Sequence, residues 1–300
     1  MPSYFEFFCG GGMVRAGLGS EWRCLLANDF DPKKADTYAL NWGKETLIVG
    51  DVRNIGTKDL LARSNGECVD LAWASFPCQD LSLAGGGAGL RGERSGTFWP
   101  FWEKMNGLAK TGKHPRIVAL ENVCGALTSH DGNDFVAITN ALIKLDYKVG
   151  AIVIDARKFL PQSRPRLFFI CIRSNIDIPI QLTEDTPSPA WHPSALVKAQ
   201  ERLQGKAKAN WVWWNPPPPP PRRKYLRQVI ETGSSETWHS RDESSYLISM
   251  MNDVNLNKLK QAQRQKKPIV GTMYRRTRYE RGNGKVQRVE VRFDGNSRLS

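Results

Sequence analysis

The residue best suited to chemistry in this sequence is Cys78, which lies in the segment 74–82 (ASFPCQDLS). The apolar run 69–73 before it has the length of a buried strand, and the segment 85–92 after it is too rich in glycine for a helix or strand. A strand therefore delivers Cys78 to a sheet edge, where ligands bind in open α/β folds. A cysteine there can act as a nucleophile when its surroundings favour the thiolate, whereas a buried core cysteine is the alternative.

The composition describes a basic chain that is long enough for a sizeable hydrophobic core. Its 300 residues include 43 lysines and arginines against 30 aspartates and glutamates, which gives a net charge of +13. This excess is typical of proteins that bind nucleic acid, but a generally basic protein would show it too. The six cysteines lack the paired spacing of metal sites and disulfide scaffolds. Without a recognisable signal peptide or membrane span, we expect a cytoplasmic protein with no membrane partner.

Three consecutive strand ends in the N-terminal part carry residues that suit a nucleotide-like ligand. Strands are expected at 5–8, 23–27 and 46–49, with helices at 13–19 and 32–42 between them. The candidate residues are Phe8, Gly10, Gly11 and Gly12 after the first strand, Asp29 and Phe30 after the second, and Asp51 after the third. Glycine turns let the backbone approach a ligand closely, and an acid after the second strand commonly holds a ribose. Ordinary solvated loops are the alternative for each turn taken alone.

Alternating helices and strands continue to about residue 174. We expect helices near 97–108 and 135–145, and strands near 116–120, 147–156 and 167–172. Glu121 follows a strand that we place beside the one leading to Cys78, so both side chains would lie at one sheet edge. Arg164 and Arg166 enter the last of these strands two residues apart, which puts their side chains on the same side. A capping role for Glu121 and surface salt bridges for the arginines are the alternatives.

The pattern changes near residue 175, where we place a domain boundary. Prolines interrupt the chain from there to the stiff run 216–221, and short helices (245–251, 256–264) and a strand (286–293) are expected beyond it. The basic clusters of this part are 222–224, 266–267 and Arg275, Arg276 and Arg278. The aromatic residues among them are Trp211, Trp213, Trp214, Tyr225 and Tyr274. Such a mixture predicts charge contacts to nucleic acid with rings available for stacking.

These motifs together resemble those of the DNA (cytosine-5-)-methyltransferases of bacterial or phage type. The similar segments are 8–12 for the cofactor motif, 76–79 for the nucleophile motif, 121–123 for the ENV motif and 162–166 for the QxRxR motif. Their order and spacing agree over residues 4–172, although Met13 stands where the first motif often has glycine. The family's last two motifs are not recognisable before Ser300. We therefore expect the chain to end before them, so that a second polypeptide or a C-terminal extension would supply them.

The resemblance implies an α/β fold with two domains. Residues 1–174 would form a Rossmann-like S-adenosylmethionine-dependent methyltransferase sheet with helices on both faces, and residues 175–300 a smaller irregular target recognition domain. The implied reaction moves a methyl group from S-adenosylmethionine to C5 of a flipped-out cytosine in a specific duplex DNA sequence. Cys78 would attack C6, Glu121 would bind N3 and the exocyclic amine, and Arg164 and Arg166 would hold the base and its adduct.

The resemblance also implies the remaining contacts and leaves alternatives open. Residues near the cofactor would be Phe8, Gly10, Gly11, Gly12, Asp29, Phe30, Asp51, Val52, Pro77 and Phe98. Residues on DNA would be Gln79, Ser82, Arg94, Arg275, Arg276 and Arg278, with the glycine-rich loop closing over the site. No metal is implied, and a cognate restriction endonuclease is a further candidate partner. One alternative is a tRNA cytosine-5 methyltransferase, against which the tryptophan-rich basic region argues, and another is a non-catalytic DNA-binding chain.

Overall fold

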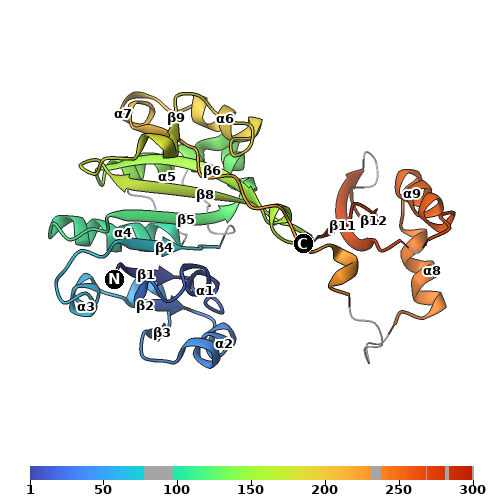
Figure 1. Ribbon diagram of the computed structural model, residues 1–300, viewed down its shortest axis with the longest axis horizontal. Coiled ribbons are helices and arrows are strands. Elements are labelled where there is room, and N and C mark those ends of the chain that lie inside the picture. The colour runs from blue at the N-terminus through green and yellow to red at the C-terminus, as the bar shows by residue number, and fades with distance from the viewer. Residues whose placement is uncertain (78–96, 231–237, 268, 281–283, 299–300) are drawn as a thin grey trace. The chain divides into compact units, whose positions relative to one another are not determined.

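The chain divides into two compact units. The computed structural model describes residues 1–77, 97–230, 238–267, 269–280 and 284–298. The first unit comprises Met1–Ile154 with Arg166–Pro217, and the second comprises Asp155–Pro165 with Pro218–Ser300. Figure 1 labels the elements of both units along the chain.

A single large sheet forms the centre of the first unit. Its strands are β1 (Ser3–Phe7), β2 (Arg23–Asp29), β3 (Leu47–Val49), β4 (Leu71–Ala74), β5 (Ile117–Val123), β6 (Tyr147–Asp155), β8 (Pro165–Arg173), β9 (Thr183–Glu184) and β10 (Trp211–Trp214). Among the described residues they follow the order β3-β2-β1-β4-β5-β8-β6-β10-β9. The strands from β3 to β5 pair in parallel, whereas β8 pairs with β5 in the antiparallel sense.

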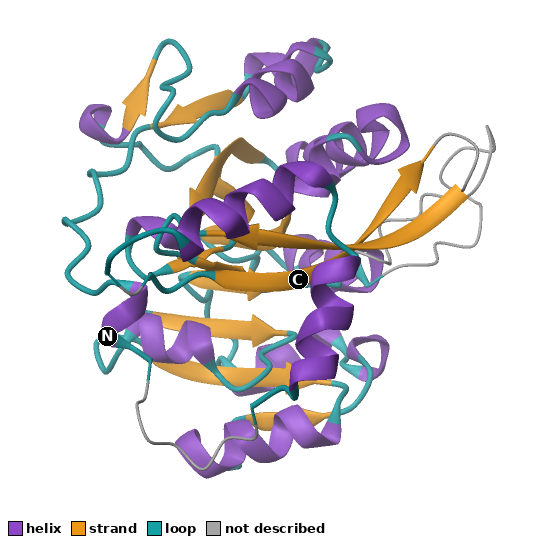
Figure 2. Cartoon of the chain, turned by 90° about the vertical axis from the view of Figure 1, so that its right-hand side faces the viewer, coloured by secondary structure: helices purple, strands orange, loops and turns teal. Residues whose placement is uncertain are grey.

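Helices cover both faces of this sheet, which confirms the α/β fold expected from the sequence (Figure 2). They are α1 (Met13–Leu18), α2 (Pro32–Trp42), α3 (Thr57–Arg63), α4 (Phe98–Lys110), α5 (Asn133–Ile143), α6 (Ser194–Glu201) and α7 (Gly205–Ala209). Of these, α3, α6 and α7 were not anticipated. None of the helices in the described ranges has the length and apolarity needed to cross a membrane.

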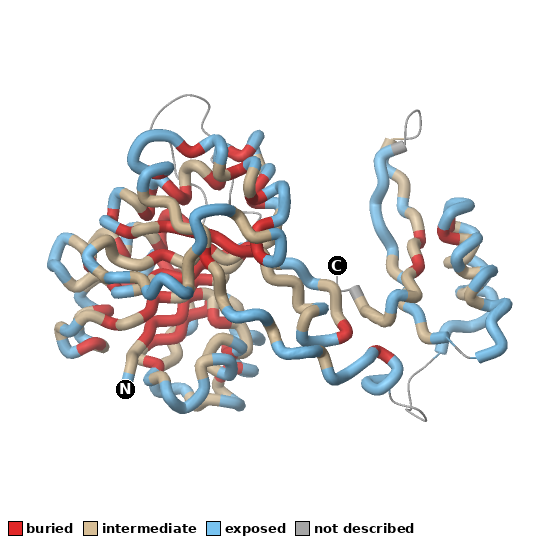
Figure 3. The backbone as a smooth tube through the Cα atoms, turned by 45° about the horizontal axis from the view of Figure 1, so that its top comes forward, coloured by how far each residue is buried: buried red, intermediate tan, exposed pale blue. Residues whose placement is uncertain are grey.

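Alternation of side chains along the strands explains the two apolar layers. On β1, Phe5 and Phe7 enter the larger core with residues of α3, α4 and α5, while Tyr4 packs on the other face with Tyr38 of α2. Successive strand residues point to opposite faces, so a strand covered on both faces must be apolar throughout. Figure 3 shows the resulting buried stretches running through the first unit.

The tryptophans of β10 belong to the first unit, which corrects their expected role as rings for stacking on nucleic acid. Trp214 is buried and donates its indole N–H to the carbonyl of Ile170 at 3.0 Å. The ring of Trp211 packs 5.7 Å from that of Phe135, and Trp213 also packs against the larger core. The strand β10 pairs with β6. Burial of the large rings on β10 therefore stabilises this part of the sheet.

The division between the units also differs from the boundary expected near residue 175. Residues 175–217, which include β9, β10, α6 and α7, pack with the first unit, and the chain changes unit inside the proline run at Pro217. The segment Asp155–Pro165 belongs to the second unit although it lies far upstream. The prolines near residue 190 interrupt the alternating pattern without ending the unit, because surface connections accommodate proline readily.

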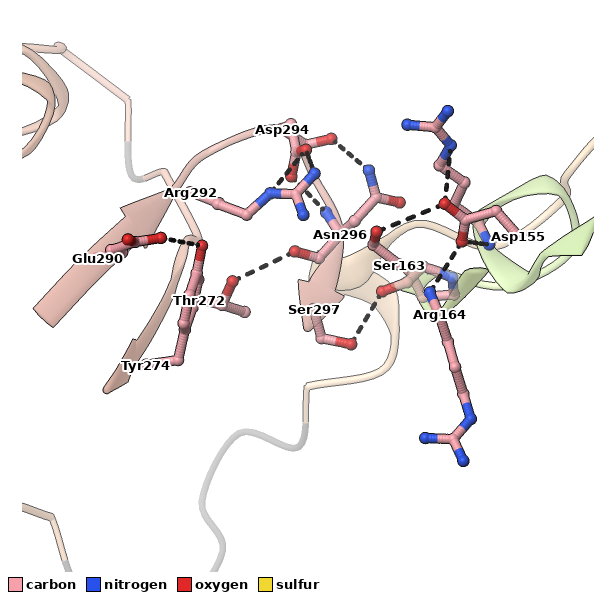
Figure 4. A network of polar contacts seen from close by, with 12 residues as sticks. Asp155, Ser163, Arg164, Thr272, Tyr274, Glu290, Arg292, Asp294, Asn296 and Ser297 are labelled. Carbon is pink, nitrogen blue, oxygen red and sulfur yellow. Dashed lines mark hydrogen bonds and ion pairs between the residues drawn. The ribbon is translucent and has the colours of Figure 1, made fainter. Parts of the chain in front are cut away.

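A hairpin and two helices form most of the second unit. The described elements are β11 (Thr272–Glu280), β12 (Gly284–Arg292), α8 (Arg241–Ser249), α9 (Asp253–Gln263) and a short parallel pair, β7 (Gln162–Ser163) with β13 (Ser297–Arg298). Val289 and Val291 of β12 are buried against Met251 and residues of both helices. In the upstream segment, Asp155 accepts a bond from the Arg164 N–H (2.8 Å). Figure 4 shows the polar contacts that join this segment to the chain around Asn296.

Glu6 generates a testable prediction, because its carboxyl is wholly buried in β1 and neither oxygen has a hydrogen-bond partner among the described residues. Burial raises the pKa of Glu6 from 4.5 to about 8. Between these pH values the folded chain keeps the proton and the unfolded chain releases it, so stability must fall as pH rises. We expect Glu6→Gln to lose less unfolding free energy than wild type between pH 5 and pH 8, measured by urea denaturation.

The exposed Glu21→Gln variant is the matched control and should follow wild type across this range. An equal loss of unfolding free energy in Glu6→Gln and wild type would contradict the assignment of a protonated Glu6.

Candidate active site

The candidate site lies at the carboxyl edge of the sheet, where the strand order reverses. From β1 the sheet continues through β2 and β3 on one side and through β4 and β5 on the other. The chain after β1 turns toward β2, since the N–H of Cys9 bonds to the carbonyl of Asn28 (2.9 Å). The chain after β4 turns toward β5, where the carbonyl of Phe76 accepts a bond from Asn122. Ligands of open α/β sheets bind at such a reversal.

The residues that lead into Cys78 are anchored on two sides. The ring of Phe76 is buried with its centroid 5.6 Å from that of Phe98, and its carbonyl oxygen lies 3.0 Å from Nδ2 of Asn122. Pro77 is exposed. The predicted site residues outside the described part of the chain are Cys78, Gln79, Ser82 and Arg94. Their roles stay predictions.

Glu121 and Arg166 form an ion pair on neighbouring strands. Arg166 Nε lies 3.0 Å from Glu121 Oε1, and the two side chains are 21% and 23% exposed. The antiparallel register sets Val123 opposite Arg166, which brings Glu121 within diagonal reach on the same sheet edge. The strand of Glu121 pairs with β4, as the sequence predicted. A carboxylate and a guanidinium fixed side by side can bind a ligand edge that carries both donors and acceptors.

Asn122 is a site residue to which the sequence reasoning assigned no role. It is 3% exposed, and besides binding the Phe76 carbonyl it accepts a bond from the N–H of Val123 (2.8 Å) through Oδ1. This side chain therefore ties the end of β5 to the segment that enters Cys78. The available signal was an amide next to Glu121 at the end of an apolar run, because a buried amide needs a specific partner.

The glycine turn after β1 has the backbone conformation that only small residues adopt easily. Gly10 and Gly12 have φ of 54° and 83°, and Phe8 reaches φ of 58° in spite of its side chain. A Cβ at Gly12 would meet Nε1 of Trp42 at 2.3 Å, so this glycine permits close packing of α2. A Cβ at Gly10 would meet no atom within 4 Å, which leaves space for a ligand beside the backbone. Strained residues of this kind cluster at functional sites.

The two acids at the strand ends have partners within the protein. Asp29 accepts bonds from the N–H groups of Gly10 (2.8 Å) and Asp31 (2.9 Å), so it holds the glycine turn against β2. Two bonds leave the Asp29 carboxylate further lone pairs for a ligand. Asp51 binds Arg53 through side chain and backbone, and these hydrogen bonds lower the pKa of Asp51. The ribose and amine contacts expected of these acids stay predictions.

The other expected cofactor residues differ in how far they are exposed. Phe30 is 71% exposed at the end of β2, so its ring is available to a ligand. Val52 and Phe98 are buried in the larger core. Burial also raises the pKa of the Cys9 thiol, which makes this cysteine of the glycine turn a poor nucleophile. Within the described ranges, no group of three or more His, Cys, Asp or Glu side chains is arranged to hold a metal ion.

The remaining predicted residues belong to the second unit. Arg164 precedes β8 and is exposed, and Figure 4 shows its side chain extending away from the contacts around Asp155. Arg275, Arg276 and Arg278 lie on β11. Arg276 and Arg278 share one face of the hairpin with Glu290, whereas Arg275 lies on the opposite face.

The anchoring role of Asn122 predicts a measurable loss of stability. Asn122→Ala leaves the buried carbonyl of Phe76 without its partner, which should lower the free energy of unfolding by about 1–3 kcal/mol. Urea denaturation measures this change. The control is Asn41→Ala, which removes an exposed bond to the Thr37 carbonyl (2.8 Å) and should change the unfolding free energy by no more than about 0.5 kcal/mol. Equal effects of the two substitutions would contradict the anchoring role.

Comparison with solved structures shows the same fold in methyltransferases. S. pombe Dnmt2 methyltransferase superposes with a TM-score of 0.51 at 19% identity, covering 87% of this chain and 67% of that one. A Spodoptera frugiperda DNMT2 mutant superposes with a TM-score of 0.55 at 16% identity, covering 78% of this chain and 61% of that one.

Sequence comparison identifies the family. Type II methyltransferase M.BsuFI of Bacillus subtilis is 32% identical over 178 residues, which are 59% of this chain and 40% of that protein. Type II methyltransferase M.HhaI of Haemophilus parahaemolyticus is 28% identical over 58% of this chain and 50% of its own length. The matches thus span half or less of these relatives. The family model described as C-5 cytosine-specific DNA methylase matches residues 3–296. The chain belongs to this family of C-5 cytosine-specific DNA methylases.

Proposed function

We propose that this chain transfers a methyl group from S-adenosylmethionine to C5 of a flipped-out cytosine in duplex DNA. The observation that carries the proposal is the Glu121–Arg166 pair at the end of β5, beside the strand that leads to Cys78. A thiol nucleophile, a carboxyl and a guanidinium are the groups that this chemistry needs. Family membership supports the same reaction.

The proposed role of Cys78 is nucleophilic. Its thiolate forms a bond to C6 of cytosine, and the C5–C6 electron pair then makes C5 the nucleophile. Loss of the C5 proton to a base after methyl transfer restores the double bond and expels Cys78. Duplex stacking hides C6, so the base must leave the helix at a cost of a few kcal/mol.

Glu121 and Arg166 are proposed to hold the cytosine during this sequence. Glu121 faces N3 and the exocyclic amine, where a carboxyl can stabilise the charge that attack at C6 places on the ring. Arg166 lies 3.0 Å from Glu121, so it can orient the carboxyl and donate to the neighbouring O2. Arg164 is proposed to act on the same adduct, as the family motif implies.

The residues after β1 and β2 fit a nucleoside cofactor. S-adenosylmethionine supplies the electrophilic methyl group when it is bound. The open space beside Gly10 lets the backbone contact such a molecule, and the exposed ring of Phe30 offers a flat apolar surface for adenine. Asp29 already holds the glycine turn and retains acceptor capacity for hydroxyl groups.

Duplex DNA is the proposed partner, and the arginines of the β11–β12 hairpin support it. The tryptophans of β10 pack in the first unit, so they do not support DNA over tRNA as the substrate. The preference for DNA instead rests on the family and on the width of the major groove, which admits a two-stranded ribbon. A cognate restriction endonuclease and a second polypeptide that supplies further motifs stay predictions.

The nucleophilic role of Cys78 predicts a covalent complex with a modified substrate. Duplex DNA that contains 5-fluorocytosine should trap the wild-type chain in the presence of S-adenosylmethionine, because fluorine cannot leave C5 as a proton does. Cys78→Ser should form no such adduct and should still bind DNA. Denaturing gel electrophoresis measures the adduct, and Cys124→Ser is the control that should trap normally. An adduct that persists in Cys78→Ser would refute the role of this residue.

The proposed adenine contact predicts a binding defect without a stability defect. Because the Phe30 ring is exposed, Phe30→Ala removes little buried area and should change the melting temperature only slightly. Its affinity for S-adenosylmethionine should fall at least several-fold, since the ring loses its stacking contact. Isothermal titration measures the affinity, with exposed Leu40→Ala as the control. Unchanged affinity in Phe30→Ala would place the adenine elsewhere.

A further inference from the structure

The β11–β12 hairpin presents two unlike faces. On one face the cross-strand pairs are Tyr274 with Glu290, Arg276 with Arg288 and Arg278 with Val286. The opposite face contains Val289 and Val291, which are buried against α8 and α9. The face that bears Arg276 and Arg278 lies away from this packing, so the hairpin can offer it to a ligand.

Glu290 organises the side chains of this face. Its Oε2 accepts a bond from the Tyr274 hydroxyl at 3.0 Å, and its Oε1 accepts from Arg278 Nε at 2.7 Å and also from Arg278 Nη2. Arg276 contributes a looser ion pair, with Nη1 at 3.8 Å from Oε2. Burial raises the pKa of Glu290, but the bonds from Arg278 and Tyr274 outweigh it, so the net pKa lies below its ordinary value. Glu290 is thus ionised at neutral pH.

The contact with Glu290 fixes the direction of the Arg278 side chain. Glu290 lies four residues along β12 from Val286, the cross-strand partner of Arg278, so the side chain must extend along the sheet face. Nε and one N–H of Nη2 are used by the carboxylate, so within the described part of the chain three of the five guanidinium N–H groups remain for other acceptors. Arg278 nevertheless stays 48% exposed.

A cleft lies beside this pair and gives a ligand access to it. The cleft has a volume of about 530 Å³ and is lined by residues of β11, β12 and α9. The charged residues that line it are Lys258, Arg278, Arg288, Glu290 and Arg292. Cations around a fixed arginine attract the DNA backbone, while the Glu290 carboxylate offsets the charge of Arg278 and so weakens its attraction to phosphate.

We infer that Arg278 reads a guanine in the DNA target and that Glu290 is the residue that positions it. This inference rests on the proposed function, because it requires duplex DNA as the partner. Guanine offers O6 and N7 side by side in the major groove, and a guanidinium with two open N–H groups matches them in a bidentate contact. Among the described residues Arg275 has no carboxylate partner, and it lies on the other face, so we assign it at most a phosphate contact.

The test measures base preference in binding, independently of catalysis. The full chain without cofactor is mixed with a duplex library that has a randomised segment, and the bound duplexes are sequenced. Wild type should enrich a sequence that contains guanine. Arg278→Ala should lower the preference for guanine at one position by about 10- to 100-fold and leave other positions unchanged. Glu290→Gln and Tyr274→Phe should relax the same position more weakly, with circular dichroism to verify folding.

The matched control is Arg275→Ala, which should keep the base preference and lower the salt dependence of binding by about one phosphate contact. An Arg278→Ala chain that keeps its guanine preference, or that weakens binding equally for all sequences, would overturn the inference. So would a wild-type chain that enriches no guanine. Covalent trapping on 5-fluorocytosine reports separately on the proposed function, so the two failures are distinguishable.

Discussion

The pairing of β4 with β5 is the constraint on which the candidate site depends. Ala74 lies opposite Leu120 in a parallel register, so both strands end at the same sheet edge. Phe76, which precedes Cys78 by two residues in the sequence, then meets Asn122, the neighbour of Glu121, across the strand ends. A shift of one residue in this register would turn Glu121 to the opposite face of the sheet. The core that fixes the register therefore also fixes the geometry of the candidate site.

Buried polar side chains extend this constraint along the whole edge. Asn28 donates to the carbonyls of Ile48 (3.0 Å) and Gly50 (2.9 Å), which ties β2 to the end of β3. Asp29 ties the end of β2 to the glycine turn after β1, and Asn122 ties β5 to the chain after β4. Each bond joins a side chain to a backbone group of a neighbouring strand end. A site built on such rigid elements keeps its groups oriented before a ligand arrives.

Much of this framework could be predicted from the sequence, because its signals are local. Glycines after β1, acids after β2 and β3, and apolar runs in β4 and β5 all follow from short-range rules. The partnership of Glu121 with Arg166 was not predictable in this way, because it depends on the antiparallel placement of β8 beside β5.

Long-range pairing also explains what was missed elsewhere. The strand Trp211–Trp214 joins β6 across about sixty residues, so a tryptophan-rich segment that suggested stacking on nucleic acid forms core instead. The upstream segment Asp155–Pro165 belongs to the second unit because β7 pairs with β13 near the other end of the sequence. Glu290 carries no motif, and its importance appears only through the side chains that converge on it.

The most direct test of the central claim is the nucleoside product of the reaction. The full chain is incubated with S-adenosylmethionine and either duplex DNA of random sequence or total tRNA, and the digested nucleosides are analysed by mass spectrometry. The proposed function predicts 5-methylcytosine in the duplex DNA, at levels that depend on Cys78. Methylation confined to tRNA, or no 5-methylcytosine in either nucleic acid, would contradict it.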